Sequence, residues 1–387
     1  MAEASMTLFP APSDETGGAG AMHNTGILPY QTIRELVRAH EIFATEDIQP
    51  DQVQPASLDL RLGPVAYRVP ASFLPGRGAT VMDKVNQLGR HPIDIAEGAV
   101  LEKGCVYIVK LLESLRLGSR ISAFANPKSS TGRLDIFTRL ITDRGTAFDR
   151  VERGYHGPLY AEIAPRTFSI VARQGSRLNQ LRLRRGSPLS SEAALRRLQE
   201  HARLVDAAPG TETIRDDSIG VTLDLGGDRA SGLVGFRAKK HTDVIDVDRR
   251  AHYDPLDYWD PIAARPGRGI VLNPDDFYIL ATKESVSVPP DHAAEMVAYD
   301  TLSGEFRVHY AGFFDPGFGY GGSGAGSKAV LEVRSHEVPY LLEHEQIVGW
   351  LRFERLTGVP DKLYGPDLGS SYQDQGLTLG KQFKTLG

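Results

Sequence analysis

The stretch Ser57-Leu58-Asp59-Leu60-Arg61-Leu62-Gly63 alternates polar and apolar side chains and ends in a glycine. Alternation with a period of two predicts a β-strand that buries one face, and the glycine predicts the turn that follows. The same pattern returns as Thr222-Leu223-Asp224-Leu225, displaced by 165 residues (from 57 to 222). This echo suggests that the chain contains two related parts.

A second echo covers a longer segment and keeps its internal spacing. Three pairs return with a displacement of 171 residues: Val100-Leu101 as Val271-Leu272, Tyr107-Ile108 as Tyr278-Ile279, and Glu113-Ser114 as Glu284-Ser285. Matched spacing predicts a duplicated β-domain, because each copy must present the same alternating faces to its own core.

The predicted fold class is therefore mainly β: two tandem β-barrel or jelly-roll domains with a few short helices. The 387 residues suffice for two cores, and 40 Gly and 24 Pro separate short apolar runs as turns do. The predicted divisions are a disordered N-terminal tail (1–25), a first domain (26–205) ending in a helix over 190–202, a linker (206–218), a second domain (219–358) and a C-terminal closing segment (359–387).

Charge and cysteine content argue against several kinds of protein. A formal net charge of −5 disfavours a general binder of nucleic acids or membrane surfaces, because affinity for phosphate backbones needs clustered positive charge. Cys105 is the only cysteine, so one chain can build neither a disulfide framework nor a thiolate metal site. The start lacks the features of a secretory signal, and no stretch is long enough to span a membrane, which predicts a cytoplasmic protein.

The segment Lys128-Ser129-Ser130-Thr131-Gly132-Arg133 places two cations around hydroxyls and a glycine. Hydroxyl, backbone and guanidinium donors can converge there on phosphate oxygens, which indicates a triphosphate site. A solvated turn would have the same composition. The corresponding stretch of the second copy is Thr301-Leu302-Ser303-Gly304-Glu305, in which a carboxylate replaces the arginine. An anion bound by the first copy would therefore not be bound by the second.

Two further side chains are candidates for chemistry. Glu162 follows Gly154-Tyr155-His156-Gly157 in a strand of mostly apolar residues, where desolvation would raise its pKa toward the range useful for a general base. A solvent-facing glutamate on an edge strand is the alternative. Gln180 offers an amide that can donate and accept in one plane, as recognition of a pyrimidine edge requires, although it could equally be solvated.

Together these segments resemble the dCTP deaminases of the trimeric dUTPase superfamily from about Gly26 to Gln375. The matching pieces are Gln54 to Gly63, similar to the first conserved strand; Lys128 to Arg133, similar to Arg-Ser-Ser-x-x-Arg; Gly154-Tyr155-x-Gly157 with Glu162, similar to Gly-Trp-x-Gly-x-x-x-x-Glu; Gln180-Leu181; and Tyr364 with Ser371-Tyr372-Gln373-Asp374-Gln375, similar to the closing segment Tyr…Lys-Tyr-Gln-x-Gln. The resemblance implies a dUTPase-like fold in both halves and proton transfer by the glutamate.

The chain departs from the family pattern at several points. Ser371 stands where the family has a lysine, and a longer stretch from Thr142 to Arg153 replaces the pyrimidine-cradling run in the first half. The second half partly keeps that run as Ala311 to Phe318, followed by Glu332. We expect a site centred on Glu162 and closed by the C-terminal segment, with Glu332 as the second candidate carboxylate or as part of a site shared between the halves. The expected substrate-binding residues are Lys128, Ser129, Ser130, Arg133, Gln180, Ala311, Tyr364 and Gln375.

The resemblance implies hydrolytic deamination of dCTP to dUTP and ammonia without zinc, since the chain lacks the Cys-x-x-Cys of the zinc deaminases. It further implies Mg²⁺ carried by the triphosphate, dTTP as an inhibitor, and a homo-oligomer. Two alternatives stay open: a dUTPase or bifunctional enzyme that also cleaves the triphosphate, and a non-catalytic nucleotide-binding regulator.

Overall fold

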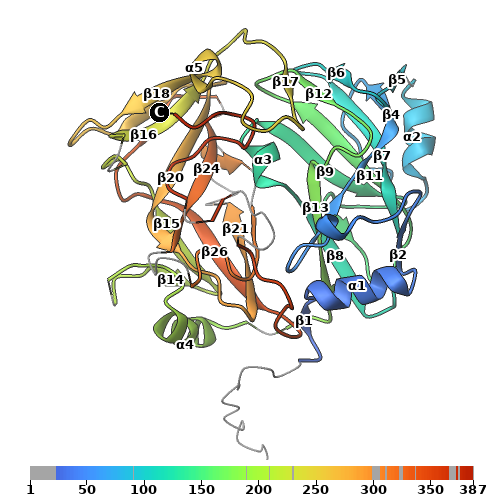
Figure 1. Cartoon of the computed structure of the whole chain (residues 1–387), viewed down its shortest axis with the longest axis horizontal. Coiled ribbons are helices and arrows are strands. Elements are labelled where there is room, and N and C mark those ends of the chain that lie inside the picture. The colour runs from blue at the N-terminus through green and yellow to red at the C-terminus, as the bar shows by residue number, and fades with distance from the viewer. Residues whose placement is uncertain are drawn as a thin grey trace, which may run out of the picture.

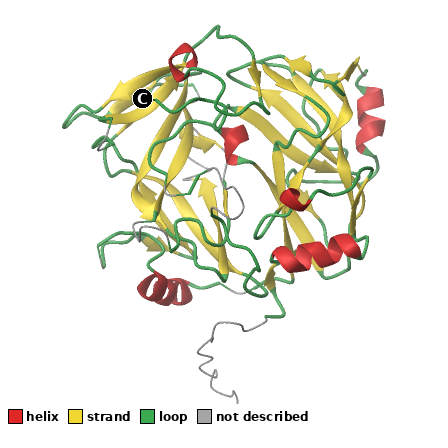
Figure 2. Ribbon diagram, in the orientation of Figure 1, coloured by secondary structure: helices red, strands yellow, loops and turns green. Residues whose placement is uncertain are grey.

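The computed structural model describes residues 23–89, 91–188, 190–208, 210–228, 231–298, 306–309, 312–321, 326–335, 337–365, 372–373 and 375–386. Most of the predicted N-terminal tail, the stretch Thr301 to Glu305, Ala311 and Ser371 lie outside these residues. Two β-rich halves stand side by side, and the short helix α3 lies where they meet (Figure 1). Strands dominate both halves (Figure 2), which confirms the predicted fold class.

The first half forms two main sheets, ordered β1-β13-β8-β10, with β3 also on β13, and β5-β4-β7-β11-β9, with β2 also on β7. Its elements are β1 (Gly26–Ile27), α1 (Tyr30–Arg38), β2 (Ile42–Ala44), η1 (Pro50–Gln52), β3 (Leu58–Leu60), β4 (Leu62–Val69), α2 (Val81–Gln87), β5 (His91–Asp94), β6 (Ala99–Leu101), β7 (Val106–Arg116), β8 (Ile121–Pro127), α3 (Ser129–Gly132), β9 (Ile136–Thr142), β10 (Arg150–Val151), β11 (His156–Pro165), β12 (Ile170–Ala172) and β13 (Asn179–Arg185).

The second half repeats this plan with the sheets β14-β15-β26-β21-β23 and β18-β16-β20-β24-β22. Its elements are α4 (Glu192–Ala202), β14 (Ile214–Arg215), β15 (Ser218–Thr222), β16 (Leu233–Ala238), β17 (Ile245–Asp246), α5 (Pro255–Tyr258), β18 (Trp259–Ala263), β19 (Ile270–Leu272), β20 (Phe277–Val286), β21 (His292–Ala298), β22 (Phe306–His309), β23 (Phe313–Phe314), β24 (Ser327–Ser335), β25 (Tyr340–Leu342) and β26 (Ile347–Arg355).

The strand register shows the internal repeat directly. In the first half Glu162 of β11 pairs with Ile108 of β7. In the second half Glu332 of β24 pairs with Ile279 of β20. The two glutamates therefore occupy equivalent positions in equivalent sheets, and any difference in their roles must come from what covers that face of each sheet.

In the second half this face packs against the first half. Ile279 and Phe277 belong to the same buried cluster as Leu134 and Phe168 of the first half. The ring of Trp259 at the start of β18 lies 5.5 Å from that of Phe168, edge to face. Burying large aromatic and aliphatic side chains across the junction contributes on the order of 1.5–3 kcal/mol for each. The halves thus share one core at their junction.

Buried ion pairs also join the halves. Arg334 of β24 binds Asp135, which lies three residues after the end of α3, and Nη2 of Arg334 also donates to Thr167 Oγ1 over 2.7 Å. Arg182 of β13 donates from Nη2 to Asp315 Oδ1 over 2.8 Å. Buried charges must be paired because desolvation is costly, so these contacts define how one half is oriented on the other.

In the first half the equivalent face is covered by the chain's own insertion between β4 and β5. This insertion carries α2, whose Thr80 and Asp83 form a reciprocal N-terminal capping box. Val81 and Val85 of α2 pack on Ile108 beside Glu162. Figure 1 shows α2 on the side of the first half that is turned away from the second half.

Helix α4 differs from the sequence-based expectation. The pattern predicts a helix at the end of the first domain, and Ser191 does cap it by accepting the Ala194 N–H over 3.2 Å. However, Leu195 packs in the core of the second half together with Ile219 and Leu351. The helix therefore belongs with the second half, because its apolar side finds its partners there.

Candidate active site

A cavity of about 520 Å³ lies between the two halves, a size suited to a small-molecule ligand. Residues of both halves and of the C-terminal segment line it. The lining includes Asp51, Asp59, Lys128, Ser129, Ser130, Arg133, Arg177 and Gln180 from the first half, and Arg250, Phe313, Asp315, Phe318, Glu332, Tyr364, Tyr372, Gln375 and Lys381 from the remainder of the chain.

The predicted phosphate segment forms the single turn α3 at the junction of the halves. Lys128 is its N-cap residue, and Nζ of Lys128 binds the buried carboxylate of Asp59. Ser129 and Ser130 follow in the turn, with Ser130 buried and Ser129 partly exposed. The structure thus brings the two hydroxyls and the lysine to one wall of the cavity, as the sequence predicts.

Arg133 closes this turn and is held by the C-terminal segment. Its Nη2 donates to Gln375 Oε1 over 2.9 Å, and its Nη1 donates to the carbonyls of Thr378 and Leu379 over 3.0 and 3.3 Å. The guanidinium carbon also lies 3.9 Å from the ring centre of Tyr372. The predicted contact between the closing segment and the site is therefore present, and its anchor is Arg133.

Glu332 projects into the cavity from β24, and its side chain is only 7% exposed. Its Oε1 lies 4.0 Å from Nε of Arg133. Burial raises the pKa of Glu332 to about 8, and the positive charge of Arg133 limits that rise. A carboxyl group with a pKa near neutrality can both take up and release a proton at the pH of a cell.

Glu162 lies elsewhere, which corrects the expectation of a site centred on it. It does not line the cavity, and its Oε1 accepts from Arg139 Nη2 over 2.6 Å and from Arg139 Nε over 3.1 Å. The same Arg139 donates from Nη2 to Ser72 Oγ over 2.6 Å, and Ser72 belongs to the insertion that carries α2. The face with Glu162 is turned toward this insertion, and its carboxylate pairs with Arg139 outside the lining of the cavity.

The other predicted residues lie around the cavity. Gln180 of β13 lines the wall beside α3, and its amide donates to the Pro127 carbonyl over 3.3 Å. Tyr364 packs its ring 5.6 Å from that of Phe318, and Gln375 also donates to the Lys328 carbonyl over 3.1 Å. Ala311 is outside the described residues, although Gly312 and Phe313 of the same run line the cavity.

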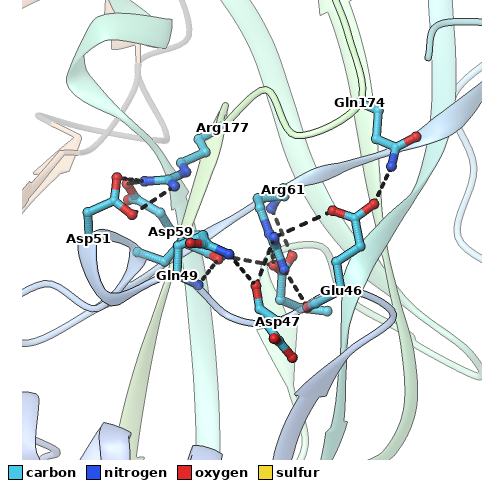
Figure 3. A network of polar contacts seen from close by, with 10 residues as sticks. Glu46, Asp47, Gln49, Asp51, Asp59, Arg61, Gln174 and Arg177 are labelled. Atoms are coloured by element: carbon cyan, nitrogen blue, oxygen red, sulfur yellow. Dashed lines mark hydrogen bonds and ion pairs between the residues drawn. The ribbon is translucent and has the colours of Figure 1, made fainter.

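Several residues that line the cavity were not predicted from the sequence. Figure 3 shows Arg177 directed at Asp51 and Asp59, with Arg177 donating to both oxygens of Asp51 over 2.8 and 3.1 Å. Arg250 and Lys381 reach the same cavity from distant parts of the chain. No local motif links these positions, because loops far apart in sequence bring them together. The run Lys381-Gln382-Phe383 is too short to indicate a binding site from sequence alone.

In the part of the chain that the structure describes, three or more His, Cys, Asp or Glu side chains nowhere come together in a way that could hold a metal ion. Nor does this part contain a helix with the length and apolar character needed to cross a bilayer.

The duplicated β-fold, with a cavity between its halves that carries both cations and carboxylates, is of the dUTPase-like class. Family comparison agrees: residues 24–187 match the 2'-deoxycytidine 5'-triphosphate deaminase N-terminal domain, and residues 191–383 match the C-terminal domain of the same family. The chain belongs to the dCTP deaminase family.

A solved structure and curated relatives extend this result. A crystal structure of 2'-deoxycytidine 5'-triphosphate deaminase from Agrobacterium tumefaciens is 55% identical, with a TM-score of 0.83 over 88% of this chain and 100% of that chain. A "dCTP deaminase, dUMP-forming" of Halobacterium salinarum is 37% identical over 28% of this chain and 54% of its own length. A protein of the same description from Mycobacterium sp. strain KMS is 31% identical over 37% of this chain and 76% of its own length.

Proposed function

We propose that the chain hydrolyses dCTP to dUTP and ammonia in the cavity between its halves, with Glu332 transferring the proton. The observation that carries the proposal is the buried carboxyl of Glu332, 4.0 Å from Arg133, in the same cavity as the hydroxyls of Ser129 and Ser130. This arrangement combines a carboxyl group whose pKa is near neutral pH with hydroxyl groups that can donate to phosphate. Family membership supports dCTP as the substrate.

In the proposed reaction, Glu332 takes a proton from a water molecule whose oxygen attacks C4 of the cytosine ring. The bond between C4 and the exocyclic nitrogen then breaks, and Glu332 returns the proton to the departing nitrogen, which leaves as ammonia. General acid and base help of this kind typically contributes ~10²–10⁴ in rate.

Arg133 acts on this reaction as a positioning residue. Its Nη donors hold the closing segment, while its charge keeps the pKa of Glu332 from rising further. Without that charge the carboxyl would hold its proton more tightly and would be a base in a smaller fraction of molecules. Arg133 thus links closure of the site to the ionisation of Glu332.

The phosphates are assigned to the α3 side of the cavity. Ser129 and Ser130 can donate to phosphate oxygens, and Lys128 supplies positive charge. The nearby carboxylates Asp51 and Asp59 are engaged by Arg177 and Lys128, so Mg²⁺ would be held through the phosphate oxygens themselves. Bound there, Mg²⁺ would neutralise part of the triphosphate charge.

A second activity at this site is favoured by the names of the relatives. The Halobacterium and Mycobacterium proteins are described as dUMP-forming, which requires cleavage between the α- and β-phosphates as well as deamination. Hydrolysis of dUTP, or binding without any reaction, are the alternatives. We propose dTTP as a competitor for the same cavity, because it shares the triphosphate and a pyrimidine ring.

Product analysis tests the proposal. Purified protein is incubated with dCTP, dUTP or dTTP and Mg²⁺, and the products are separated by anion exchange while ammonia is measured. Deamination alone yields dUTP and ammonia, whereas dUMP with pyrophosphate identifies the bifunctional reaction. The Glu332→Gln variant, which keeps the shape but cannot exchange the proton, should release ammonia at least ~10²-fold more slowly. Turnover of this variant at the wild-type rate would remove Glu332 from the reaction.

A further inference from the structure

Lys381 reaches the cavity from the C-terminal segment, and its backbone is fastened on both sides. Its N–H donates to Tyr372 Oη over 3.2 Å, and its carbonyl accepts from the Ala251 N–H over 2.9 Å. The next two residues, Gln382 and Phe383, are buried at 1% and 6% exposure. The position of the Lys381 side chain at the cavity is therefore set by the folded chain and not by a freely moving end.

The charge of Lys381 has no carboxylate partner among the described residues. The other lining cations of the first half are engaged: Lys128 with Asp59, and Arg177 with Asp51. Partial burial, together with the positive charges of Lys128 and Arg250, lowers the pKa of Lys381 to about 8. Placing an ammonium group where it is desolvated and repelled costs folding free energy, which an anionic ligand would offset.

Arg133 is poorly placed to neutralise a second or third phosphate. Its Nη donors already serve Gln375, Thr378 and Leu379. Among the charges that act on Lys381 are those of Lys128 and Asp59, which line the same cavity at its α3 side. Lys381 is therefore within electrostatic reach of the wall to which the phosphates are assigned.

We infer that Lys381 is a binding residue for the phosphate chain of the nucleotide, contacting the phosphates more distant from the pyrimidine. The inference rests on the proposed function, because it assigns one more cation to the same nucleotide site. The C-terminal segment would then have two roles at the site: it closes the cavity, and it supplies the positive charge of Lys381.

Binding of dCTP, dCMP and inorganic tripolyphosphate to the full chain tests the inference. Calorimetry in the Glu332→Gln background avoids turnover, and KM and kcat are measured in the wild-type background. Lys381→Met should weaken dCTP and tripolyphosphate binding by about tenfold or more, corresponding to ~1.4 kcal/mol, and dCMP binding by less than about twofold. KM for dCTP should rise more than kcat falls. Lys381→Arg should restore most of the affinity.

Lys384, which is exposed three residues further along, provides the matched control. Lys384→Met should leave all three affinities unchanged, and Lys381→Met should not lower the thermal unfolding midpoint, because it removes an uncompensated charge. Equal dCTP affinity in Lys381→Met and wild type, with dCTP still deaminated by wild type, overturns the inference alone. If the wild-type protein binds no dCTP and forms no product, the proposed function itself fails.

Discussion

The side chains of Arg133 and Glu332 approach within 4.0 Å although they belong to different halves of the chain. The first half supplies the α3 turn that ends at Arg133, and the second half supplies the strand that carries Glu332. Glu162, the equivalent of Glu332, is instead paired with Arg139 of its own sheet. The duplication has therefore produced two glutamates in equivalent strands with different partners, and only one of them shares a cavity with the phosphate segment.

The first prediction concerns the number of working sites. Glu162→Gln should retain ammonia release within about threefold of wild type, because the proposed mechanism gives proton transfer, which is worth ~10²–10⁴ in rate, to Glu332 and not to Glu162. Calorimetric titration with dCTP, carried out with Glu332→Gln present to prevent turnover, should give one bound nucleotide per chain. The number should be the same whether residue 162 is Glu or Gln. A second bound nucleotide that disappears with Glu162→Gln would contradict this view.

The second prediction concerns the pH dependence of catalysis. The base must be deprotonated to accept a proton from water, and the pKa of Glu332 is raised to about 8 in the free protein. We therefore expect kcat/KM for dCTP to increase as pH rises through about 8 and then to level off. Steady-state rates between pH 6 and 9.5 check this, and a flat profile across that range would argue against Glu332 as the base.

The third prediction concerns stability. The folded protein holds the Glu332 proton more tightly than the unfolded chain does, because the pKa of this carboxyl is raised from 4.5 to about 8 on folding. The contribution of Glu332 to the free energy of unfolding is therefore fully present below pH 4.5 and is lost as pH rises through about 8. Glutamine cannot ionise, so Glu332→Gln should be more stable than wild type at pH 9 by a few kcal/mol at most, at ~1.4 kcal/mol per pKa unit. Chemical unfolding at pH 5 and pH 9 measures the difference, which should nearly vanish at pH 5. A constant difference at both pH values would contradict the argument.

The fourth prediction concerns the junction of the halves. Arg334→Met leaves the Asp135 carboxylate without its buried guanidinium partner, and breaking such a pair typically costs about 3–5 kcal/mol. Urea unfolding of Arg334→Met should show this loss, together with weaker dCTP binding because the cavity lies between the halves. The exposed pair of Arg196 and Glu192 serves as control, since Arg196→Ala should change stability by no more than ~0.5 kcal/mol. A similar decrease in the free energy of unfolding in both variants would contradict the prediction that the buried pair at the junction stabilises the protein more than an exposed pair does.

Local pattern alone was sufficient for the fold class and for the segment from Lys128 to Arg133. Alternation in strands and the 171-residue displacement of Tyr107-Ile108 predict two β-domains, because side-chain alternation is a property of each strand by itself. The segment from Lys128 to Arg133 is likewise a local arrangement of donors. The closing segment with Gln375 was expected only from the resemblance to the dCTP deaminases, because its residues carry no local pattern of their own.

Only the tertiary structure shows which of the two glutamates lines the cavity between the halves. Glu162 and Glu332 lie in strands of the same kind and oppose Ile108 and Ile279 in the same register. The difference arises from what packs on each sheet: the insertion with α2 covers one, and the other half with Arg133 covers the other. These contacts join residues separated by long stretches of chain, so no local periodicity records them. Burial and charge pairing at the junction determine which carboxyl lies in the cavity between the halves.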